Sequence, residues 1–331
     1  MARKKTAAKQ TSSNTRYAAD NDPQEIANAS VLKIAKRICN ARPDDHLVSI
    51  LADLRDVDIG RKNPGGFYQR QELAAPVAAK LLDQAGLSLP DPVVSPDVSG
   101  GAYQLSSISP IRYISQLIRS NTTAVMQLGS GWSSSLMQVY LARGATRSKK
   151  IHYYGGEHSR SGMICSKYLA ARDPKLNFRS FHFDFAMPDV TFLERQKGHI
   201  LLFTSHGIER QSTLGTALFD QLHMIPNPVT VVHIEPVGWQ RDATLLERRM
   251  SNDSAFFEEL GARVTAGDST SVSENAAWWS WRAGYNTDLL ATLSQLERSG
   301  AIDMQQQAFD FSAQGNVLNP SSLIHYDFVR S

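Results

Sequence analysis

Hydrophobic residues recur along the chain at two different spacings, and the spacing changes near residue 121. Before that point the spacing is helical, as in QEIANASVLKIAKRICNA (24–41), whose apolar residues fall near one face. Further helices are predicted over 43–57, with Asp44 or Asp45 as N-cap, and over 66–87 and 111–120. A loop rich in Pro, Ser and Gly is predicted over 88–110. Residues 23–121 are therefore expected to form a helical N-terminal cap region.

After residue 121 short apolar segments, rich in β-branched and aromatic residues, alternate with helical patterns. Strands are predicted over 124–128, 150–157, 178–185, 199–205 and 229–237. Helices are predicted over 134–143, 161–172, 188–196 and 212–224. Repeated units of this kind indicate an α/β fold with a parallel sheet covered on both faces. After a helix over 286–300, two strands over 303–315 and 321–329 follow without a helix between them, which predicts an antiparallel hairpin.

The segment TTAVMQLGSGWSSSLMQVY (122–140) joins the first of these strands to a helix through closely spaced glycines. Gly129 and Gly131 lack the Cβ atoms that would keep a ligand away from the backbone. The serines at 133–135 are N-cap candidates, and the free N–H groups of a helix start attract an anion. No Lys follows, which excludes a P-loop. A tight turn with small residues for packing explains this segment alone equally well.

Acidic residues lie at the ends of the next two predicted strands. Glu157 closes the second strand and is followed by His158, and Asp184 lies at the end of the third. A carboxylate at the tip of the second strand is placed to accept both hydroxyls of a ribose. Each residue has a simpler explanation, since Glu157 could cap the following helix and Asp184 could belong to a turn. Together with the glycines, the two carboxylates predict a nucleoside-binding edge of the sheet.

From Thr122 to the end the chain resembles class I S-adenosylmethionine-dependent methyltransferases, in which QLGSGWS (127–133) matches the glycine motif. The resemblance implies a Rossmann-like sheet of five parallel strands with a terminal antiparallel hairpin, over residues 122–331, and S-adenosylmethionine as cofactor, with S-adenosylhomocysteine as product. In place of the family's usual acid at the head of the motif stands Gln127. By this resemblance the cofactor is expected to contact Gln127, Gly129, Ser130, Gly131, Glu157, His158 and Asp184.

Candidates for the chemistry lie at the ends of the fourth and fifth strands. The fourth offers Thr204, Ser205, His206 and Glu209, and the fifth offers His233, Glu235 and Trp239. His206 titrates near neutrality and is a candidate general base, although a loop histidine bonded to the backbone is an equal alternative. Glu235 needs a partner if it is buried: it could orient substrate, act as base or pair with Arg241. His233, deeper in the same strand, is expected to be a core histidine.

Trp278, Trp279 and Trp281 cluster in a predicted insertion between the fifth strand and the last helix. They are expected to pack in a core or interface, the alternative being an aromatic wall of the acceptor pocket.

These residues predict methyl transfer to an oxygen or nitrogen atom of a small metabolite, with a protein or peptide acceptor left open. One alternative is a catalytically silent subunit that binds S-adenosylmethionine or S-adenosylhomocysteine beside another enzyme. A second alternative is an NAD-dependent oxidoreductase. It is disfavoured because a dinucleotide fingerprint usually opens its domain, whereas long helical sequence precedes this one.

Composition sets outer limits on these predictions. Of 331 residues 42% are apolar and 20% charged, with a net charge of +3, which is ordinary for a soluble protein. Residues 1–22 carry the basic residues Arg3, Lys4 and Lys5 and are expected to be a disordered tail. Nothing in the sequence indicates a metal site, a membrane span or a strong nucleic-acid interface, while a homodimer is compatible with it. With only two cysteines, a reducing, cytoplasmic location is expected.

Overall fold

The computed structural model describes residues 22–62, 110–144, 150–313 and 318–330, with side chains masked over 55–62. The predicted basic tail, apart from Asp22, lies outside the described residues, as do the helix predicted over 66–87 and nearly all of the loop predicted over 88–110.

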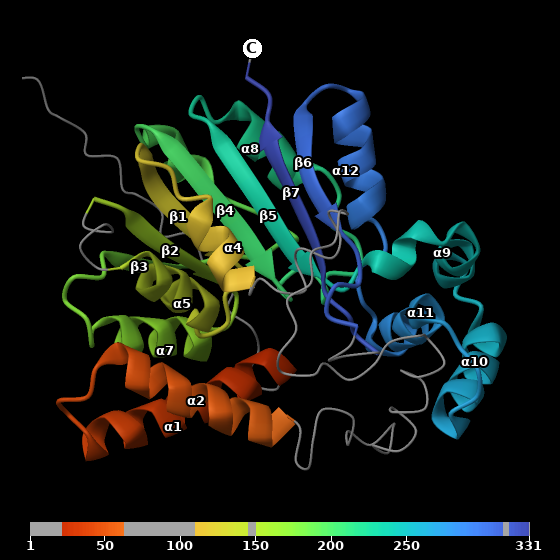
Figure 1. Cartoon of the computed structure of the whole chain (residues 1–331), viewed down its shortest axis with the longest axis horizontal. Coiled ribbons are helices and arrows are strands. Elements are labelled where there is room, and N and C mark those ends of the chain that lie inside the picture. The colour runs from red at the N-terminus through yellow and green to blue at the C-terminus, as the bar shows by residue number, and fades with distance from the viewer. Residues whose placement is uncertain (1–21, 63–109, 145–149, 314–317, 331) are drawn as a thin grey trace, which may run out of the picture.

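Two helices form the described N-terminal layer, α1 (Pro23–Ala41) and α2 (Leu47–Lys62), and Figure 1 shows them side by side below α7. Asp22 begins α1 by accepting the N–H groups of Gln24 and Glu25, and Pro23 occupies the first turn. The predicted N-cap of α2 is wrong. That helix begins beyond both aspartates, and Asp45 instead pairs with Arg42 at 3.2 Å.

Seven strands form one sheet: β1 (Thr122–Leu128), β2 (His152–Glu157), β3 (Phe178–His182), β4 (His199–Ser205), β5 (Val229–Glu235), β6 (Ile302–Ala308) and β7 (Ser322–Phe328). Their order is β3-β2-β1-β4-β5-β7-β6. Strands β1 to β5 are parallel, whereas β7 runs antiparallel to both β5 and β6. The five parallel strands and the terminal hairpin are therefore confirmed.

The helices of this part are α4 (Pro110–Gln116), α5 (Ser134–Arg143), α7 (Arg160–Ala170), α8 (Ala217–Met224), α9 (Ala243–Met250), α10 (Ser254–Ala266), α11 (Val272–Ala283) and α12 (Leu289–Arg298). Short 3₁₀ helices are η1 (Thr191–Arg195) and η2 (Gly238–Arg241). The helix predicted from residue 212 begins only at Ala217, because the carboxylate of Asp288 binds the N–H groups of Leu214 and Gly215 and holds that segment outside the helix.

Successive residues of the central strands point to opposite faces of the sheet, as the two-residue period of a strand requires. Val125 and Phe203 enter a core shared with α1, α2, α4 and α5. Met126 and Leu202 enter a second core on the other face, shared with α8 and α12. Helices α4, α5 and α7 thus lie on the same face as the N-terminal layer, and the sheet is covered on both sides.

Helices α9, α10 and α11 form a separate hydrophobic cluster around Trp239 and Trp278, to one side of the sheet in Figure 1. Trp281 stacks on Phe257 with ring centroids 5.5 Å apart. The prediction that the tryptophans pack in a core is confirmed.

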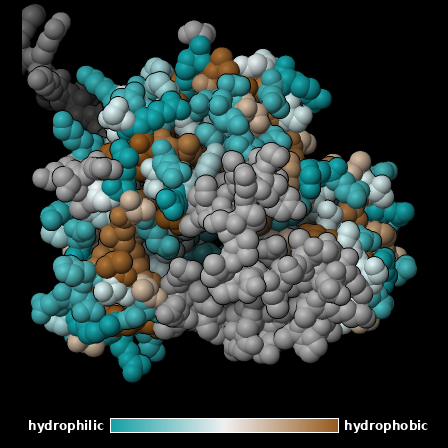
Figure 2. Space-filling model, viewed as in Figure 1, coloured by the Kyte–Doolittle hydropathy of each residue, from teal (hydrophilic) through white to brown (hydrophobic). Residues whose placement is uncertain are grey.

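The surface seen in Figure 2 carries hydrophilic residues over most of its described part, with hydrophobic residues scattered between them. Within the described residues, no helix combines the length and apolar character that crossing a bilayer requires.

Candidate active site

The glycine loop after β1 packs directly against the loop after β4. Gly129 has φ of +63°, and a Cβ there would lie 2.7 Å from Cα of Gly207. Gly131 has φ of +54°, and an added Cβ would meet nothing closer than 3.8 Å. Gly129 is therefore required by backbone packing and conformation together, whereas Gly131 is required by its left-handed conformation and leaves open space beside the chain.

Three serine hydroxyls form a small hydrogen-bonded network between the glycine loop and α7. Ser133, buried and at φ of +61°, lies 3.1 Å from Ser130 Oγ and 2.9 Å from Ser166 Oγ on α7. Ser133 is the N-cap position of α5, but its side chain caps no backbone N–H group. The network ties the glycine loop to α7.

Gln127 supplies the capping bond that the serines do not. Its buried side-chain carbonyl accepts the backbone N–H of Leu136 at 3.0 Å, in the first turn of α5. The neutral amide at this position thus has a structural role that a carboxylate could also fulfil.

Glu157 connects the tip of β2 to the glycine loop. Its carboxylate accepts the N–H groups of Gly131 at 2.7 Å and Ser159 at 2.9 Å, and the residue is 3% exposed. Gly155, two residues before it, lets β2 pack closely against the glycine loop, because a Cβ on Gly155 would lie 2.5 Å from Ser133 Oγ. Glu157 is not among the residues that line the glycine-loop cavity, so its contact with a cofactor stays a prediction.

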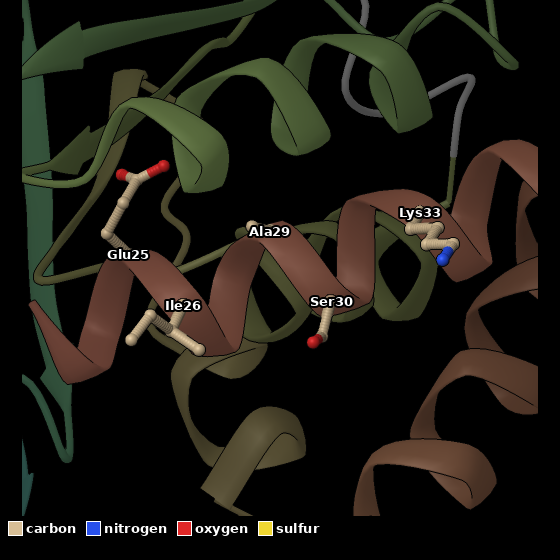
Figure 3. A pocket seen from close by; sticks show the side chains of 5 residues that line it. All are labelled: Glu25, Ile26, Ala29, Ser30 and Lys33. Carbon is tan, nitrogen blue, oxygen red and sulfur yellow. The ribbon is translucent and has the colours of Figure 1, made fainter. Parts of the chain in front are cut away.

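Helix α1 lies beside the same loop and is bonded to the start of α7. Asn28, 3% exposed, donates to Ser159 Oγ at 2.7 Å, and the Glu25 carboxylate accepts the N–H of Ser161 at 3.1 Å. Glu25 and Ile26 both line a hollow of about 410 Å³ on this side of α1. Figure 3 shows Glu25 pointing toward α7, whereas Ile26 points away from α7. Sequence analysis missed Asn28, although a polar residue on the apolar face of α1 was a readable signal.

His158 and Asp184 lie apart from the glycine loop's cavity. The His158 ring lies 5.6 Å from that of His182. Asp184 lies beyond the end of β3, and its carboxylate accepts the N–H of Ala186 at 2.8 Å, which is the turn role considered as its alternative. Contact between either residue and a cofactor stays a prediction.

His206 forms a hydrogen-bonded pair with Glu209, which follows the same strand. Its Nδ1 lies 2.6 Å from Oε2 of Glu209, and its Nε2 lies 2.9 Å from Oγ of Ser321. Burial acts to raise the pKa of Glu209, but His206, Arg210 and Asn319 together outweigh burial and hold that pKa below its usual range. Glu209 follows His206 by three residues in the same loop.

Glu235, fully buried at the end of β5, holds this loop in place. Its carboxylate accepts the backbone N–H groups of Gly207 at 3.0 Å, Ile208 at 3.2 Å and Glu209 at 3.2 Å. Burial raises the pKa of the Glu235 carboxyl to about 7. The suggested pairing with Arg241 is wrong, because Arg241 pairs with Asp310 at 3.4 Å. A direct catalytic role for Glu235 stays a prediction.

Two cavities meet at His206. One, of about 240 Å³, is lined by the glycine loop and Gln127, by Gln24 and Asn28 of α1, and by Glu209 and Arg210. The other, of about 230 Å³, lies between α4, α5 and the ends of β4 and β5. Both are lined by Ser135, Ser205 and His206. The arrangement offers two adjoining ligand sites with a titratable imidazole at their common wall.

The other candidates of the sequence have structural roles. His233 is buried between Thr204 Oγ1 and the Tyr326 hydroxyl, each at 3.0 Å, and burial lowers its pKa to about 3, which confirms a core histidine. Among the described residues, no group of three or more His, Cys, Asp or Glu side chains could hold a metal ion.

Comparison with known proteins gives weak similarities, all to solved structures. No family model matches the chain, and no curated protein matches it. The citrinin polyketide synthase CMeT domain is 10% identical, with 92% of this chain and 66% of that chain covered and a TM-score of 0.39. The CcbJ methyltransferase from Streptomyces caelestis is 12% identical, with 79% and 100% covered and a TM-score of 0.39.

An O-methyltransferase from Bacillus cereus, in complex with S-adenosylhomocysteine, is 12% identical, with 77% and 92% covered and a TM-score of 0.39.

The fold assignment rests on the sheet itself. Five parallel strands, with the glycine loop after the central β1 and an antiparallel terminal hairpin, define the Rossmann-like fold of class I S-adenosylmethionine-dependent methyltransferases.

Proposed function

We propose that this protein is an S-adenosylmethionine-dependent methyltransferase that acts on an oxygen or nitrogen atom of a small acceptor. The observation that carries the proposal is the pair of adjoining cavities, one beside the glycine loop, with the His206–Glu209 pair at their common wall. We also propose a cytoplasmic location, because both cysteines of the protein are unpaired.

The residues around the glycine loop fit the cofactor. Gly131 leaves open space beside the backbone, and the Glu157 carboxylate keeps accepting positions for ribose hydroxyls. Arg210, which lines the same cavity, offers a cation for the carboxylate of the methionine moiety. Gln127 faces the cavity as well and keeps an accepting lone pair on its amide oxygen.

The bound cofactor would supply the methyl group, whose bond to sulfur breaks as its bond to the acceptor atom forms. The contribution of the protein is to position the acceptor and to receive its proton. The ionised Glu209 can only accept a hydrogen bond, so the nearer Nδ1 of His206 carries the proton and Nε2 accepts a hydrogen bond from the Ser321 hydroxyl at 2.9 Å. An acceptor hydroxyl or amine that takes the place of the Ser321 hydroxyl would face the same nitrogen. Nε2 is therefore the atom that receives the proton of an acceptor hydroxyl or amine.

Calorimetric titration with S-adenosylmethionine, S-adenosylhomocysteine and NAD tests the proposal. We expect saturable binding of the two sulfur compounds and none of NAD. Glu157→Ala is expected to lose this binding, while Glu247→Ala, at an exposed site on α9, is the matched control. Binding of NAD alone would exclude the methyltransferase proposal.

A silent cofactor-binding subunit is the second candidate, and the neutral Gln127 at the head of the glycine motif favours it. The two candidates differ in the effect expected at His206. An enzyme loses turnover there and keeps cofactor binding, whereas a silent subunit has no turnover to lose in any acceptor screen.

A further inference from the structure

The cavity between α4 and the ends of β4 and β5 differs in chemistry from its neighbour at the glycine loop. Its apolar lining comes from Pro110, Ile111, Ile114, Phe203 and Ile234. Among the described residues that line it there is no Lys, Arg, Asp or Glu, whereas Glu209 and Arg210 line the glycine-loop cavity. We propose that this second cavity is the acceptor site, and that it takes a neutral, largely apolar alcohol or phenol of about one ring.

The lining argues against a charged acceptor. An ammonium or carboxylate group taken from water into an apolar site loses several kcal/mol of hydration unless a partner charge replaces the water. No described lining residue other than His206 can carry a charge, and its Nδ1 already faces Glu209. A neutral molecule loses little on entering the site and gains contact with the half-buried apolar side chains of Pro110 and Ile111.

The volume of the cavity suits a small ring. A volume of about 230 Å³ is room for roughly eight waters at about 30 Å³ each. One ring with a few substituents fills such a space, and a larger acceptor would have to extend beyond the lining residues.

The polar groups of the cavity gather where it meets the glycine-loop cavity. His206 and Ser321 line it there, with Nε2 and Oγ 2.9 Å apart, so a hydroxyl is already accommodated against the imidazole. Ser135 and Ser205 are shared with the other cavity. An acceptor with one hydroxyl therefore directs it toward Nε2 and keeps its apolar body against α4. This inference rests on the proposed function, because it assigns the acceptor side of the same site.

Fluorine NMR on the full chain, without added cofactor, tests the inference through binding alone. The probes are 4-fluorophenol, 4-fluorobenzoate and 4-fluorobenzylammonium, which share a ring and differ in charge. We expect saturable binding of 4-fluorophenol only. Ile111→Trp fills the cavity and should weaken that binding by about tenfold or more. Leu117→Trp, just beyond α4 and outside the lining, should leave it unchanged.

If Ile111→Trp does not fold, as judged by circular dichroism, Gln138→Phe on α5 obstructs the same cavity. Binding of either charged probe as tightly as 4-fluorophenol overturns the inference, as does 4-fluorophenol binding that both obstructing variants leave unchanged, or no binding of any probe. Separate titrations with S-adenosylmethionine distinguish failure of this inference from failure of the proposed function. Cofactor binding without 4-fluorophenol binding rejects the acceptor site and leaves the proposed function standing. The reverse pattern rejects the proposed function and retains a site for neutral ring compounds.

Discussion

Nδ1 of His206 lies 2.6 Å from Oε2 of Glu209, three residues further along the same loop. His206 itself has φ of +52°, a backbone conformation that is uncommon for residues other than Gly, although Asn, Asp and His adopt it more often than most. The loop is held by three N–H bonds to Glu235 at the tip of the adjoining strand. The backbone of His206 therefore has an uncommon conformation, and the buried carboxylate of Glu235, from another strand, stabilises the loop that contains it.

Replacing His206 by Asn should remove the base without disturbing the backbone, because Asn tolerates the left-handed conformation. We expect turnover to fall by roughly 10²- to 10⁴-fold, the usual contribution of a general base, with a much smaller effect on cofactor affinity, since His206 also lines the cofactor cavity. Acceptor-dependent formation of S-adenosylhomocysteine and calorimetric titration measure the two quantities. His223→Asn, at an exposed residue of α8, is the control. Equal activity of both variants would contradict the assignment of His206.

Glu235→Ala should leave three backbone N–H groups of the His206 loop without their acceptor. Each unsatisfied buried group costs about 1–3 kcal/mol, so we expect a loss of at least about 2 kcal/mol in unfolding free energy. Turnover should fall as well, because His206 loses its position. Urea unfolding and kinetics measure the effects. Glu235→Gln keeps one accepting oxygen and should recover part of both losses. If Glu235 were instead the base itself, Gln would recover stability but no activity.

Gly129→Ala tests the contact between the β1 and β4 loops. The added Cβ meets the backbone of Gly207 at 2.7 Å in addition to its unfavourable positive φ. Gly284→Ala, at φ of +68° with nothing within 4 Å, has only the conformational penalty of about 1–2 kcal/mol. Gly129→Ala should therefore destabilise more than this control and weaken cofactor binding. Equal melting temperatures for the two variants would argue against the close contact.

His199 should make the stability of the protein fall in mild acid. It is buried between the Oγ1 atoms of Thr122 at 2.6 Å and Thr230 at 2.9 Å, and burial lowers its pKa to about 4. The unfolded chain therefore binds a proton at higher pH than the folded protein does. The stabilisation is present above the unfolded pKa of about 6.5 and is lost as the pH falls toward 4.

The expected loss is on the order of 3 kcal/mol across that window. It is measured as the pH-dependent difference in unfolding free energy between the natural chain and His199→Asn. His46→Asn, at an exposed histidine, is the control. A difference for His199→Asn that does not change with pH would contradict the lowered pKa.

The strands and the helix after the glycine loop were predictable because their signals are local. Val125 and Met126 are consecutive residues of a predicted strand, so the two-residue period of a strand already places them on opposite faces of the sheet. The partners of the site residues were not predictable, since they depend on contacts between distant segments. Asn28 reaches Ser159 across 131 residues, and Ser321 reaches His206 across 115. The N-cap of α2 was mispredicted because the helix begins only at Leu47, and the Asp45 carboxylate pairs with Arg42 instead of capping it.

The wall that His206, Ser135 and Ser205 provide to both cavities makes the two ligand affinities interdependent. A ligand that shifts the imidazole from one side changes the space and the hydrogen bond offered on the other. Thermodynamic linkage requires the effect to be mutual, so each ligand alters the affinity of the other by the same factor. Affinities measured one ligand at a time would then describe a different protein state from the one in which both sites are filled.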